Sequence, residues 1–209
     1  MLDVHFVILG AVIGSIGAAL YLRDTVRGVT QPNRVTWLMW AIAPLLAFAA
    51  EVHAGVGLRS LMTFVVGFGP LLIFLASFRN PASAWELRRL DYVCGALSAA
   101  GLVAWLVTSH GTVAIAASIA ADALAAVPTL RKSWRSPETE TAAAYFAASL
   151  NAGITLLTVS EVTTAVVAFP IYILVIATLE TILIASRLGP RLRQRRTEAR
   201  ASTDSPAAA

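Results

Sequence analysis

The sequence predicts an all-α integral membrane protein with seven transmembrane helices. Hydrophobic residues make up 57% of the 209 residues and charged residues only 13%, whereas a soluble domain carries about 25% charged residues. Apolar runs of about 20 residues recur along the chain, and a helix of that length crosses a bilayer. Basic residues gather in alternate connections between these runs.

The apolar runs define the predicted helices in order, and together they leave little chain for a soluble domain. They are Val4–Leu22, Val35–Val52, Leu61–Phe78, Leu90–Val107, Thr112–Leu130, Thr141–Val159 and Val162–Ser186. An acid, Asp3, and no Lys or Arg precedes the first run. A cleavable signal peptide has a basic start, so we expect the first run to be retained as a helix.

The distribution of Lys and Arg predicts the orientation, because cytoplasmic loops retain basic residues. The first, third and fifth connections and the tail hold 15 of the 16 Lys and Arg residues, and only Arg59 lies on the other side. The N-terminus is therefore expected outside and the C-terminus in the cytoplasm. Residues 188–209 are polar and basic, which predicts a disordered tail that contacts anionic lipid and no nucleic acid.

The chain repeats itself at an offset of 108 residues. Leu22–Arg27 matches Leu130–Arg135, and Trp37 falls opposite Tyr145. We therefore predict two three-helix repeats, residues 1–79 and 112–187, joined by a linker helix in residues 80–111, a 3+1+3 plan. Because the linked unit has an odd number of helices, both repeats run in the same direction. Parallel repeats are one of the two plans of membrane transporters, with the substrate site near the midplane between the halves.

The 3+1+3 plan, the N-out topology and the Pro-x-Leu-x-Lys-Ser sequence of Pro128–Ser133 resemble the PQ-loop/SWEET superfamily of seven-helix membrane transporters. The resemblance covers residues 4 to 187, with Pro128-Thr129 in the place of the family's Pro-Gln pair. It implies a small-molecule solute as partner and alternating access between two three-helix bundles. It also implies that Pro128, on helix five, is a hinge.

Asp122 is the strongest candidate for a site residue, because it lies near the middle of the fifth apolar run. A carboxylate at that depth costs roughly 2.5–3.5 kcal/mol on insertion scales, so it should face a cavity or a partner. Ser118 lies on the same helix face, and small residues of helix one form a matching face. We interpret Asp122 as a proton-binding or amine-binding group; the alternative is a structural hydrogen bond to a neighbouring helix.

Other polar residues in the apolar runs are weaker candidates. Asn151 and Thr155, one turn apart on helix six, would contact a polar substrate or tie two helices together. Glu180, on helix seven, is expected to snorkel or to pair with Arg187 rather than to form a second proton site.

Prolines and tryptophans in the runs suggest moving parts. Pro44, Pro70 and Pro128 interrupt helices two, three and five and are candidate hinges, although prolines are frequent in membrane helices in any case. Trp37 and Trp40 begin helix two, where they would form an inner gate or anchor the helix at the membrane interface.

The leading hypothesis is a carrier of a small polar solute, with proton coupling left open. The sequence has no nucleophile–base pair, no phosphate-binding glycine loop and no metal-ligand spacing, so neither an enzyme nor a cofactor or metal is expected. The alternatives are an accessory subunit or assembly factor of a membrane complex, or a seven-helix receptor. A retinal photoreceptor is excluded, because the single lysine, Lys132, lies in a predicted loop. The excess of Arg over Lys and the alanine-rich composition suggest a bacterial inner membrane.

Overall fold

The computed structural model describes residues 2–53, 55, 57–107 and 111–204. This part of the chain forms eight α-helices and three short 3-10 turns, with no strand. The helices are α1 (Phe6–Val26), α2 (Arg34–His53), α3 (Ser60–Ala76), α4 (Arg89–Val107), α5 (Gly111–Arg135), α6 (Ala142–Leu157), α7 (Thr164–Ser186) and α8 (Leu188–Asp204). Each of the seven predicted runs coincides with one helix from α1 to α7.

Three helical segments are long and apolar enough to cross a membrane. They are Phe6–Val26, Gly57–Ala76 and Val166–Ser186, and shorter apolar stretches occur at Arg34–Ala49 and Ala142–Leu157. Large apolar side chains on the outside support contact with lipid: Ile16 and Val175 are 55% and 62% exposed. A soluble protein would not cover its outer face in this way. These features indicate a membrane protein.

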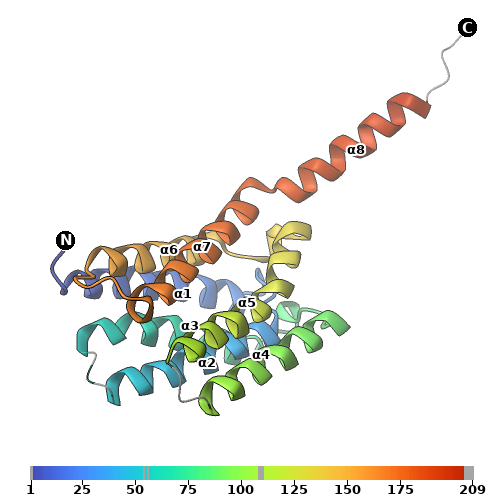
Figure 1. Cartoon of the computed structure of the whole chain (residues 1–209). Helices are drawn as coiled ribbons and strands as arrows, with labels where there is room; N and C mark the ends of the chain where they lie inside the picture. The colour runs from blue at the N-terminus through green and yellow to red at the C-terminus, as the bar shows by residue number, and fades with distance from the viewer. Residues whose placement is uncertain (1, 54, 56, 108–110, 205–209) are drawn as a thin grey trace, which may run out of the picture.

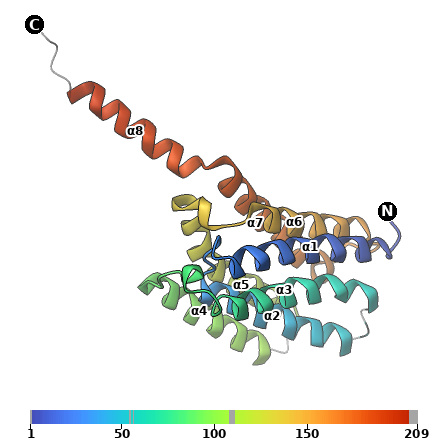
Figure 2. The same ribbon diagram turned by 180° about the vertical axis from the view of Figure 1, so that it is seen from behind.

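Six helices form a closed ring. Each packs against the next in the order α1, α3, α2, α5, α7, α6 and back to α1, while α4 packs outside the ring against α5 and α2. Figures 1 and 2 show from both sides that α1 and α6 lie next to each other, although they are far apart in the sequence. The ring encloses the central site described below.

Small residues allow the helices of the ring to approach closely, as in other membrane bundles. At Gly17 of α1, an added Cβ would meet the Ala147 side chain of α6 and lie 3.2 Å from the Ala144 backbone. Between α2 and α5, the hydroxyl of Thr36 donates to the Ala125 carbonyl oxygen at 2.8 Å. These contacts join helices from distant parts of the chain.

The tail was predicted to be disordered, but the structure shows that most of it forms helix α8. Residues Leu188–Asp204 continue as a helix that extends away from the bundle (Figures 1 and 2), and residues 205–209 lie outside the described part. The physical reason is local. Arg, Ala, Gln and Glu all favour helix, and Gln194 donates to Glu198 one turn later at 2.9 Å. At its start, Gly189 packs so tightly against the Trp134 backbone that a Cβ would clash.

Candidate functional site

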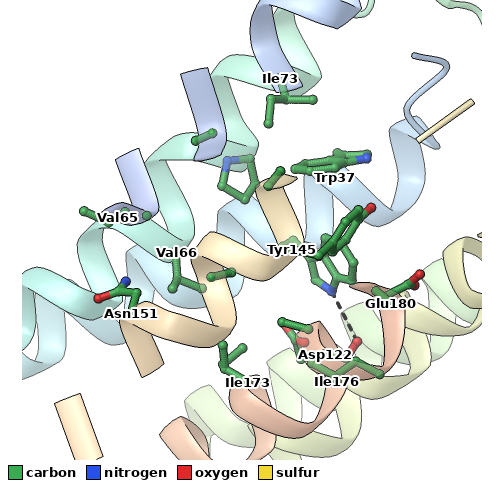
Figure 3. Close-up of a pocket in the computed structure, with 17 residues that line it drawn as sticks. Trp37, Val65, Val66, Ile73, Asp122, Tyr145, Asn151, Ile173, Ile176 and Glu180 are labelled. Atoms are coloured by element: carbon green, nitrogen blue, oxygen red, sulfur yellow. Dashed lines mark hydrogen bonds between the residues drawn. The ribbon is translucent and has the colours of Figure 1, made fainter. Parts of the chain in front are cut away.

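A cavity of about 110 Å³ lies inside the ring (Figure 3), with walls from α1, α2, α3, α5, α6 and α7. A single water needs roughly 10–15 Å³ on this scale, so the cavity has room for several waters or for one small solute. Its wall is mainly apolar, with polar atoms from only a few side chains. This composition is typical of a small-molecule site.

Asp122 forms part of the cavity wall from α5. Its side chain is buried because the surrounding face of α5 consists of buried alanines and packs against α7 and α2. The hydroxyl of Tyr172, on α7, donates to Asp122 Oδ2 at 2.6 Å. The indole N–H of Trp40, on α2, reaches the Asp122 backbone carbonyl at 3.5 Å, the dashed line in Figure 3. Asp122 is thus held between three helices.

Asn151 lines the cavity from α6 and is fully buried. Among the described residues, neither its Nδ2 nor its Oδ1 has a hydrogen-bond partner. Glycines of α1 make room for it: a Cβ at Gly10 would lie 2.7 Å from Oδ1, and one at Gly14 would lie 3.1 Å from Nδ2. Thr155 is buried one turn further on, where its hydroxyl donates to the Asn151 backbone oxygen at 2.9 Å. The Thr155 hydroxyl is therefore bonded within α6, and Thr155 is not part of the cavity wall.

The structure corrects the interpretation of Glu180. This residue is fully buried and lines the cavity, as Figure 3 shows, at the end opposite Asn151. In the described part of the chain, neither carboxylate oxygen has a hydrogen-bond partner, and Arg187 forms no ion pair with it. The Ser133 hydroxyl lies beside Glu180 but outside hydrogen-bonding geometry. A snorkelling side chain extends along the outside of the bundle, whereas Glu180 is enclosed within it.

An aromatic cluster closes one end of the cavity. Its members are Tyr21 of α1, Trp37 and Trp40 of α2, and Tyr145 of α6. The Tyr21 and Trp37 ring centroids are 4.5 Å apart, and Tyr145 lies 6.4 Å from both tryptophans. Trp37 is only 4% exposed, so it does not anchor the helix at a membrane interface.

A buried ion pair lies beyond this cluster, and sequence reasoning missed it. Lys132 Nζ is 2.5 Å from Glu140 Oε1, and both side chains are almost fully buried. The hydroxyls of Tyr21 and Tyr145 donate to the other Glu140 oxygen at 2.6 and 2.9 Å. The placement of Lys132 in a loop is therefore wrong, because α5 continues through Pro128 to Arg135. The one available signal was that Lys132 is the single lysine of an arginine-rich chain.

The remaining predicted site residues do not all reach the cavity. Pro70 lines it from α3, whereas Pro44 lies in α2 outside the described cavity wall. Pro128 borders a second hollow at the end of α5, together with Trp85 and several arginines. Ser118 belongs to α5, but its side chain lies outside the described part of the chain. The structure thus gathers Asp122, Asn151, Glu180, Pro70, Trp37 and Trp40 around one cavity.

The chain was compared with protein-family models, with curated proteins and with solved structures, and none of them matches. The site is therefore interpreted from its own residues.

Proposed function

We propose that the protein is a membrane carrier of a small polar solute. It works by alternating access between the bundles α1–α3 and α5–α7, with α4 as the linker. In this proposal seven helices cross a bacterial inner membrane, the N-terminus is outside, and the plan is that of the PQ-loop/SWEET-like transporters. The observation that carries the proposal is the central cavity, which six helices line and whose mainly apolar wall includes Asp122, Glu180 and Asn151.

The symmetry of the helix contacts supports two equivalent halves. The pairs α1–α3 and α2–α3 have counterparts in α5–α7 and α6–α7, and α1–α6 has its counterpart in α2–α5. The cavity wall follows the same relation, since several of its residues pair at the 108-residue offset found in the sequence. These pairs are Gly14 and Asp122, Trp37 and Tyr145, Trp40 and Ala148, and Val65 and Ile173.

The aromatic cluster and the hydrogen bond from Tyr21 to Glu140 support alternating access. Tyr21 and Trp37 belong to one bundle, while Tyr145, Lys132 and Glu140 belong to the other. Opening the cavity towards this end requires Tyr21 to leave Glu140 and the aromatic rings to separate. The Tyr21–Glu140 hydrogen bond and the contact between the Trp37 and Tyr145 rings lie between the two bundles, so one rocking motion would break both. The Lys132–Glu140 ion pair lies within the second bundle.

Transport by reconstituted protein tests this proposal. Wild type and Asp122→Asn are placed in liposomes, and solute uptake and lumenal pH are recorded over a panel of amino acids, organic amines, sugars and vitamins. Asparagine keeps an acceptor for the Tyr172 hydroxyl, so the fold should persist. We expect wild-type uptake of at least one solute and its loss in Asp122→Asn. Asp3→Asn is the matched control, because Asp3 is exposed and bonded locally to His5.

One result would oppose the carrier, and another would oppose only the role of Asp122. Silence of folded wild-type protein over the whole panel would argue against a carrier and favour an accessory subunit, to be sought as a stoichiometric partner after mild detergent extraction. Uptake that is equal in wild type and Asp122→Asn would keep the carrier but remove Asp122 from its mechanism.

A further inference from the structure

The charged groups of the cavity wall are acidic. Asp122 and Glu180 line the cavity, and no Lys, Arg or His stands among the described residues of its wall. The nearby cation, Lys132, is bound to Glu140 and donates to the Gln31 backbone carbonyl. A low-dielectric space between these carboxyl groups therefore favours a positively charged occupant.

The amide of Asn151 does not add a second polar contact for the occupant. Buried polar atoms in folded proteins are almost always hydrogen-bonded, and an unpaired one costs free energy. Both polar atoms of Asn151 are unpaired in the described structure, at the end of the cavity opposite Glu180. Both atoms are buried against Gly10 and Gly14 of α1, so neither is open to an occupant of the cavity.

Aromatic rings form the wall near Asp122. Trp37, Trp40 and Tyr145 all border the cavity, and the Trp40 indole N–H is bonded to the Asp122 backbone. The faces of such rings attract ammonium groups, including quaternary ones. The volume of about 110 Å³ limits the occupant to a small solute.

We propose that this cavity binds a small organic cation, with its ammonium group at Asp122 beside Trp40. Calling this cation the transported solute rests on the carrier function proposed above; the binding itself does not. The binding site is asymmetric, because the counterpart of Asp122 in the first half is Gly14, which carries no charge.

Binding of matched probes to the full-length protein in lipid nanodiscs tests the proposal. The cations are ethanolamine and choline. The neutral probe is the carbon isostere of choline, in which a tert-butyl group replaces the trimethylammonium group, and the anion is propionate. Saturable binding of radiolabelled choline or ethanolamine is expected. The isostere should compete at least roughly tenfold more weakly, which corresponds to one charged contact, and propionate should not compete.

Variants show whether Asp122 binds the cation. Asp122→Asn should weaken cation binding roughly 10- to 150-fold, the range for a hydrogen bond to a charged group. Asp3→Asn should bind as wild type does. Tryptophan fluorescence of each variant verifies the fold, because Trp37 and Trp40 line the same cavity.

The outcomes separate this inference from the carrier function. Equal binding of choline and its isostere, preference for propionate, no binding of either cation, or unchanged binding by folded Asp122→Asn would each overturn the inference. Selective cation binding without uptake into liposomes would sustain it and oppose the carrier. Uptake of another solute without cation binding would support the carrier and overturn the proposed cation site.

Discussion

Replacing Lys132 with methionine removes the charge of the buried ion pair and keeps an unbranched side chain. Lys132 Nζ lies 2.5 Å from Glu140 Oε1, and the two side chains are 1% and 0% exposed. After the substitution, Glu140 retains the hydroxyl donors of Tyr21 and Tyr145 but loses its ion-pair partner. The variant thus leaves a buried carboxyl group without compensation for its charge.

The structure predicts a large loss of stability. Removing one member of a buried ion pair costs about 3–5 kcal/mol, far more than the loss of an exposed pair. One kcal/mol corresponds to roughly 2–4 °C in Tm for a chain of this size, so Tm should fall by roughly 6–20 °C. The double variant Lys132→Met/Glu140→Gln should recover part of this loss, because no unpaired charge then remains.

Thermal unfolding of the purified protein in one detergent, followed by near-ultraviolet circular dichroism, measures these shifts. Arg131→Met is the matched control: Arg131 is the preceding residue of α5 and is exposed, so its loss should change stability by less than about 0.5 kcal/mol. A Tm for Lys132→Met equal to that of Arg131→Met would refute the buried pair. Strict additivity in the double variant would refute the coupling between Lys132 and Glu140.

Three further predictions concern helix packing and orientation. Gly17→Ala should destabilise the protein by about 1–3 kcal/mol, because the added Cβ meets the Ala147 side chain. Gly153→Ala is the control and should be neutral or stabilising, since its Cβ makes only an ordinary contact at 3.8 Å. Thermal unfolding compares the two variants, and equal shifts in Tm would contradict the close α1–α6 contact. Asn33→Ala should lower the free energy of unfolding by about 1–2 kcal/mol in the same assay. The Asn33 side chain accepts hydrogen bonds from two backbone amides at the start of α2 and donates one to Asp91 at 2.9 Å. An unchanged Tm would argue against this helix cap. A fluorescent protein that matures only in the cytoplasm should fluoresce in intact bacteria when it is fused to the C-terminus. Alkaline phosphatase, which is active only on the outer side of the membrane, should be inactive at the same position. The reverse pattern would contradict the proposed orientation.

Helix positions were largely predictable from the sequence. A helix satisfies its backbone hydrogen bonds within one segment, so an apolar run of sufficient length reveals it. The ends of the helices were less certain: α5 continues past Pro128 to Arg135, and the polar tail forms α8. Pro128 and the basic residues after it suggested that α5 ends early, and the polar composition of the tail suggested disorder. In the tail, the helix propensity of its residues and the packing of Gly189 on Trp134 favour helix instead.

The candidate site was predictable only where a residue stands out from its own segment. Asp122 stands out because an acid inside an apolar run is costly, and the structure places it in the cavity wall. That Asn151 faces the glycines of α1, and that Glu140 meets both Lys132 and Tyr21, depends on how the helices rotate and pack. Tyr21 and Glu140 are 119 residues apart, so no local pattern records their contact.

By itself, then, the sequence determined that the chain is helical, where seven of its helices lie and that Asp122 needs a protected place. Only the tertiary structure decided which helices are neighbours, that Glu180 lies inside the bundle, and that Lys132 is buried. The physical reason is that a membrane helix satisfies its backbone hydrogen bonds within one segment, which is visible in the sequence as a continuous apolar run. Packing between helices depends on the side chains of two segments together, so the sequence of one segment does not determine its partner.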